Sequence, residues 1–111
     1  MLLIILAITS TLSQNLAGVW HGNAKTPDDK EILFVFLFEK NQEIYKTTMA
    51  VPTFDVSGIK PKSTSLKAGK ITIDGVELGM KYEGVWNETT NQIEGTCTEG
   101  GVKLVLNLVK G

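Results

Sequence analysis

A short pattern recurs in three alternating segments of this chain: a glycine followed two residues later by a side chain suited to a sheet interior. It occupies residues 18–20, 84–86 and 95–97. Glycine inside a strand usually marks a bend, a bulge or the close approach of another backbone. Because the pattern recurs on several strands, it indicates an antiparallel sheet that curls toward closure. We therefore expect an all-β chain that forms a small barrel.

The rest of the sequence divides into short alternating segments separated by turn residues, without helical periodicity after the first residues. These segments predict eight or nine short strands in up-and-down order, a lipocalin-like β-barrel. Such a barrel is filled by side chains or holds one small ligand. Residues 52–62 are expected to form a long irregular connection, and a bend is expected at residues 77–80. The predicted strands cover residues 16–25, 31–40, 43–51, 63–68, 70–76, 81–86, 92–98 and 102–110.

The first residues form an apolar run about half as long as the ~20 residues that a membrane-spanning helix needs. The run has the length of the apolar part of a secretory signal peptide, although no basic residue precedes Leu2. We expect a signal peptide over residues 1–14, cleaved after Ser13 or Gln14, and one barrel domain over residues 15–111. The alternative is a buried first strand or helix. The leader predicts a secreted or periplasmic protein, and without a cysteine at its end no stable membrane anchor is expected after cleavage.

The charged residues argue against a nucleic-acid partner. All 11 basic side chains are lysines, and the net charge is only -1. Nucleic-acid and phosphate sites favour the planar, bidentate fork of arginine, which this chain lacks. The single cysteine, Cys97, allows no internal disulfide. An odd cysteine in a secreted protein can be reactive, but its place on the strand face of Ile93 favours a packed thiol.

The sequence predicts no catalytic site, no cofactor site and no metal site. His21 is the only histidine and stands at an outward-alternating position. A hydrolytic triad requires a nucleophile, a base and an orienting group, and no such set is recognisable. Glu83 and Glu94 are expected to be solvated strand residues. The pair Asp28 and Asp29 lies in a turn without the further oxygen ligands that calcium requires.

Two other features suggest binding. Trp20, Tyr82 and Trp86 are expected on inward faces, where aromatic walls suit a flat or apolar ligand. The alternative is that they fill a narrow barrel. The strand from Ile32 to Phe38 is apolar at every position and is therefore expected to be buried on both faces. Its outer face then needs a cover, which is either a loop, another chain or another domain.

An ordered series of short motifs carries a resemblance to a known family. It begins with Leu-Ala-Gly-Val-Trp-His-Gly at residues 16–22 and the apolar strand at residues 33–40, and it continues through residues 49–62, 78–79, 82–84, 93–96, 100–101 and 104–108. This series resembles the small β domain that precedes the catalytic domain of many secreted bacterial α/β-hydrolases. The segment at residues 53–56 departs from that family, which is more polar there. A weaker likeness to lipocalin and avidin-type barrels is confined to the Gly-x-Trp opening.

The resemblance implies a domain that carries no catalytic triad, because in that family the nucleophile elbow lies in the following domain. We therefore predict a non-catalytic, secreted β-barrel accessory or interaction domain, associated with an α/β-hydrolase parent. Its predicted docking surface for a hydrolase domain or another protein is the strand from Ile32 to Phe38. The alternative is a small lipocalin-like or avidin-like carrier that holds an apolar ligand between Trp20, Tyr82 and Trp86.

Overall fold

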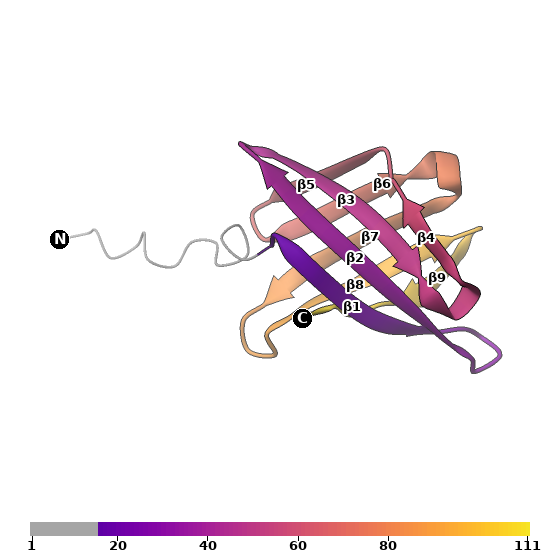
Figure 1. The fold of residues 1–111 in the computed structure, drawn as a ribbon. Helices are drawn as coiled ribbons and strands as arrows, with labels where there is room; N and C mark the ends of the chain where they lie inside the picture. The colour runs from indigo at the N-terminus through magenta and orange to yellow at the C-terminus, as the bar shows by residue number, and fades with distance from the viewer. Residues whose placement is uncertain (1–15) are drawn as a thin grey trace.

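The computed structural model describes residues 16–111, and the predicted signal peptide lies outside the described residues. Strands make up most of this part of the chain, which contains no α-helix (Figure 1). Two short 3-10 turns, η2 (Pro52–Phe54) and η3 (Val76–Leu78), interrupt them. The strands are β1 (Gly18–Lys25), β2 (Glu31–Asn41), β3 (Ile44–Val51), β4 (Val56–Ile59), β5 (Ser63–Lys67), β6 (Lys70–Gly75), β7 (Met80–Asn87), β8 (Gln92–Glu99), β9 (Val102–Val105) and β10 (Val109–Lys110).

The strands form one antiparallel sheet in the order β10-β1-β2-β3-β5-β6-β7-β8-β9, and β4 pairs with β3 beside this path. Neighbours in the sheet are mostly neighbours in the chain, so the predicted up-and-down order is confirmed. Figure 1 shows the strands wrapping around a common interior. The predicted all-β, barrel-like fold is therefore correct.

The last segment of the chain joins the two ends of the sheet. Strand β9 pairs with β8, whereas β10 pairs with β1. Between them, the Leu106 amide donates to the Gly95 carbonyl at 2.9 Å, and Leu108 exchanges two backbone hydrogen bonds with Ile93. The prediction of one unbroken strand over residues 102–110 is wrong, because the ladder to β8 becomes irregular at residues 106–108, just before Val109 and Lys110 pair with β1.

Alternation along β2 places its phenylalanines in the core. Phe34, Phe36 and Phe38 are all at most 2% exposed. The Phe36 ring meets Phe38 and Tyr82 edge to face, with ring centroids 5.9 Å and 5.4 Å apart. This geometry is the one that aromatic pairs prefer. The centre of the barrel is therefore filled by side chains.

The connection between β3 and β5 is more ordered than expected. Residues 52–62 contain η2 and β4 rather than an irregular loop, so that prediction is wrong in detail. The prolines and the glycine of this segment are typical of a loop, and its strand β4 forms by pairing with the second half of β3. Strand β5 pairs with β3 only at Tyr45 and Thr64, where the Thr47 and Thr64 hydroxyls lie 2.6 Å apart.

The connection between β6 and β7 lies where the sequence predicts a bend. The η3 turn ends at Gly79, whose φ of 74° is readily adopted by glycine. Its amide donates to the Val76 carbonyl at 2.9 Å. A tight turn at the Asp-Gly dipeptide of residues 74–75 would have left unequal strands, and the structure instead keeps β6 and β7 paired up to Gly75 and Met80.

Candidate functional site

The three aromatic residues predicted to line a cavity all lie on inward faces, but they do not form one group of free walls. Trp20 is 1% exposed, and its Nε1 donates to the Leu16 carbonyl at 2.8 Å. Tyr82 is fully buried, and its hydroxyl donates to the Leu106 carbonyl at 2.9 Å. Both polar groups are hydrogen-bonded to backbone carbonyls, as expected of side chains that fill the barrel.

Trp86 differs from the other two because it is only half-buried. Its ring meets Trp20 edge to face, with centroids 6.1 Å apart. Its Nε1 has no hydrogen-bond partner among residues 16–111. The structure thus brings Trp20 and Trp86 together, whereas Tyr82 packs against Phe36.

A hollow of about 210 Å³ opens at the end of the barrel where β3, β6 and β8 finish. The sequence does not predict this hollow, because its walls come from separate strands and turns. The one feature of the sequence that could have indicated the hollow is the apolar character of η3, because turns are ordinarily polar. The hollow is lined by Phe34, Met49, Val51, Ile59, Leu78, Met80 and Glu99.

The outer face of β1, β2 and β3 carries the apolar side chains that the sequence placed on the second face of β2. Val19 lies opposite Leu37, and Val35 lies opposite Ala50. Val19 and Leu37 are 43% and 37% exposed. The η2 turn lies beside the start of β2, where the Leu33 amide donates to the Thr53 hydroxyl at 2.8 Å. We call the outer face of these strands the outer patch, formed by Val19, Leu33, Val35, Leu37 and Ala50.

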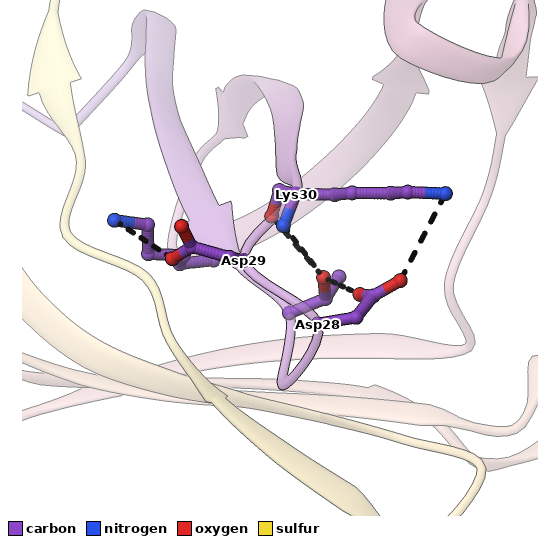
Figure 2. Close-up of polar contacts among 5 residues, drawn as sticks. Asp28, Asp29 and Lys30 are labelled. Carbon is purple, nitrogen blue, oxygen red and sulfur yellow. Dashed lines mark hydrogen bonds and ion pairs between the residues drawn. The ribbon is translucent and has the colours of Figure 1, made fainter.

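The acidic turn between β1 and β2 uses its carboxylates for local contacts (Figure 2). Asp29 pairs with Lys25 at 3.2 Å, and Asp28 pairs with Lys30 at 3.8 Å and accepts a hydrogen bond from Thr26. Because the two carboxylates reach different lysines, they do not converge on a common point. Nowhere in residues 16–111 do three or more histidine, cysteine or acidic side chains gather as a metal site would require.

The residues considered for acid–base chemistry lie apart from the hollow's apolar walls. His21 is half-exposed and lies opposite Val35 on the outer side of the sheet. Glu83 and Glu94 are exposed, as the alternation predicts, and Glu83 lies within 3.7 Å of the amines of Lys70 and Lys81. Exposed pairs of this kind contribute little to stability.

Cys97 is fully buried in the core, as its strand position predicts. Burial raises the pKa of its thiol from the ordinary value of 9.0 to about 11, and the negative charge of Glu99 adds to this effect. Burial also raises the pKa of Tyr82, with a contribution from Cys97. Since the thiolate is the reactive form, Cys97 is held in its unreactive state at neutral pH.

The raised pKa of Cys97 makes the stability of the fold dependent on alkaline pH. The folded protein keeps the thiol proton at pH values where the unfolded chain loses it. The contribution of the protonated thiol to the free energy of unfolding is therefore complete below pH 9.0 and is lost as pH rises to about 11. We expect the free energy of unfolding to fall by roughly 1–3 kcal/mol over this interval.

Urea denaturation at a series of pH values measures this loss. In the Cys97→Ala variant, the fall in free energy of unfolding that begins near pH 9 should disappear. Only the fall at higher pH, which is due to Tyr82, should remain. An identical pH dependence in the two proteins would show that the thiol does not titrate in this way.

Comparisons with models of protein families, with curated proteins and with solved structures gave no match. The resemblance to the β domain of secreted α/β-hydrolases therefore stays a prediction. Among residues 16–111, the structure contains no helix of the length and apolar character needed to cross a bilayer.

Proposed function

We propose that this protein is a non-catalytic β-barrel interaction domain that docks onto another protein domain through the outer patch. The supporting observation is that β2 is apolar on both faces, although only its inner face belongs to the core. An outward row of leucine and valine side chains gains free energy only when something covers it. Contiguous exposed apolar surface often marks a protein interaction site.

The series of sequence motifs suggests which class of partner covers the outer patch. The resemblance to the β domain of secreted bacterial α/β-hydrolases suggests a hydrolase domain as this partner, in a secreted or periplasmic protein.

Absence of activity in the isolated chain is part of the same proposal. Tyr82 and Trp20 donate to backbone carbonyls, and His21 lies on the outside of the sheet. The alternative, an apolar-ligand carrier built on Trp20, Tyr82 and Trp86, receives less support because two of these side chains are packed and hydrogen-bonded within the core.

The proposal predicts that a charge in the outer patch weakens docking. Isothermal titration calorimetry with an α/β-hydrolase domain from the same source should show binding by the wild-type chain. We expect Val35→Lys and Leu37→Lys each to weaken binding by tenfold or more, since burial of an unpaired ammonium opposes about 1.4 kcal/mol or more of association free energy.

Val85→Lys is the matched control, because Val85 is 52% exposed on β7, outside the outer patch. It should bind as the wild type does. Equal affinities for all variants, or no binding by the wild type at about 100 μM, would contradict the docking proposal. Ester hydrolysis by the isolated chain, lost in a His21→Ala variant, would contradict the non-catalytic part.

A further inference from the structure

The exposed apolar side chains of the turns gather at one end of the barrel. In an up-and-down barrel the connections β1–β2, β3–β5, β6–β7 and β8–β9 share one end, and the intervening connections share the other. The residues at the first end include Phe54, Val76 and Leu78, which are 61%, 68% and 49% exposed. Turns on a protein surface are ordinarily polar. An apolar rim at the same end as the hollow indicates that this opening receives apolar material.

The wall of the hollow is suited to accommodate a guest. Met49 and Met80 supply flexible, polarisable thioethers, which adapt to irregular shapes. Gly75 makes room for one of them, because a Cβ there would lie 2.4 Å from the Met80 sulfur. Leu78 and Ile59, which also line the hollow, belong to η3 and β4, two short elements at the periphery of the barrel.

Size and charge define the class of guest. A closed apolar cavity of about 150 Å³ accepts benzene, so a hollow of about 210 Å³ accepts a six-carbon group. Glu99 supplies the only ionisable side chain among the lining residues, and it is exposed at the mouth. Its carboxylate attracts a cation and repels an anion. We propose that this hollow is a binding site for small amphiphiles that have a short apolar tail and a cationic amine head.

This site is independent of the outer patch, because it is formed at the barrel end by a different set of residues. Either proposal can therefore fail without the other. The competing occupant of the hollow is a side chain from another protein. If small amphiphiles do not bind, that occupant is favoured and the proposed site is wrong.

The three methionines of the chain give a direct test. The full chain, labelled with ¹³C at the methionine methyl groups, is titrated with hexylamine, hexanol and hexanoate and observed by NMR. We expect saturable shifts of the Met49 and Met80 methyl signals that follow one binding curve. A ligand this small is expected to bind with a Kd of about 1 mM.

Affinity should decrease in the order hexylamine, hexanol, hexanoate. The exposed charge pair between the amine and the Glu99 carboxylate should make hexylamine bind about fivefold more tightly than hexanol. Glu99→Gln should remove this preference and leave hexanol binding unchanged. The proposal is overturned if no ligand gives a saturable shift of the Met49 and Met80 signals, or if hexanoate binds most tightly.

A variant that fills the hollow provides a second test. Ile59 lines the hollow, and Ile59→Phe should weaken hexylamine binding at least tenfold by occupying the space. The control is Ile44→Phe, the same substitution at a 62% exposed position where β3 begins, at the other end of the barrel. Thermal unfolding confirms that both variants are folded. Undiminished binding by folded Ile59→Phe would place the ligand elsewhere and overturn the site.

Discussion

Replacing Gly22 by alanine should strongly destabilise the fold, because it places a methyl group against the segment that closes the sheet. A Cβ at this position would lie 2.0 Å from the backbone oxygen of Asn107 and 3.2 Å from the Leu106 side chain. The oxygen belongs to the segment that joins the two ends of the sheet, so it cannot move aside without disturbing the pairing of β10 with β1.

We expect Gly22→Ala to lower the free energy of unfolding by about 3 kcal/mol or more, at the upper end of overpacking effects. In a domain of this size that corresponds to a decrease in Tm of roughly 12 °C or more. Thermal and urea denaturation measure both quantities.

The matched control for Gly22 is the next residue. Asn23→Ala introduces the same side chain at an exposed position of β1 and should change stability by no more than about 0.5 kcal/mol. A Gly22→Ala protein as stable as the wild type would show that the closing segment does not press against β1 in solution.

Replacing Phe36 by alanine should lower the free energy of unfolding by a similar amount, because it leaves a cavity, whereas Gly22→Ala overpacks the core. Phe36 is fully buried and packs edge to face with Phe34, Phe38 and Tyr82. Deleting its ring removes buried apolar area and leaves a cavity that the stiff surrounding strands cannot close. Phe36→Ala is expected to cost about 3–5 kcal/mol in free energy of unfolding.

Leu37→Ala is the control for Phe36, because the adjacent side chain points to the other face of β2. Leu37 is 37% exposed, so its truncation should cost about 1 kcal/mol or less in the isolated chain. Comparing the two variants by urea denaturation separates the inner face of β2 from the outer patch. Equal losses would mean that the outer face of β2 is as tightly packed as the core.

The sequence located most strand boundaries to within a residue or two, because alternation and turn residues act locally. It also placed Cys97 in the core and a bend near Gly79, and both are confirmed. It did not locate β4, because Gly58 and the flanking prolines are typical of a loop and the strand depends on pairing with the free edge of β3. It did not locate the irregular pairing at residues 106–108, where the segment is still bonded to β8 just before β10 pairs with β1.

The candidate sites divide in the same way. Alternation alone indicated that β2 has a second apolar face, since a period of two assigns each side chain to one side of a strand. The hollow at the barrel end could not be predicted, since Phe34, Ile59 and Met80 lie far apart in the chain and an empty volume is set by what surrounding side chains fail to fill.

For this protein, the sequence by itself determined the strands, the turns and which side chains face inward, because these follow from local backbone preferences and side-chain alternation. Only the tertiary structure decided how the sheet closes at Gly22 and Asn107, where the η2 turn bonds to β2, and where a hollow remains at the barrel end. Those properties depend on distances between segments remote in the chain, which no local pattern encodes.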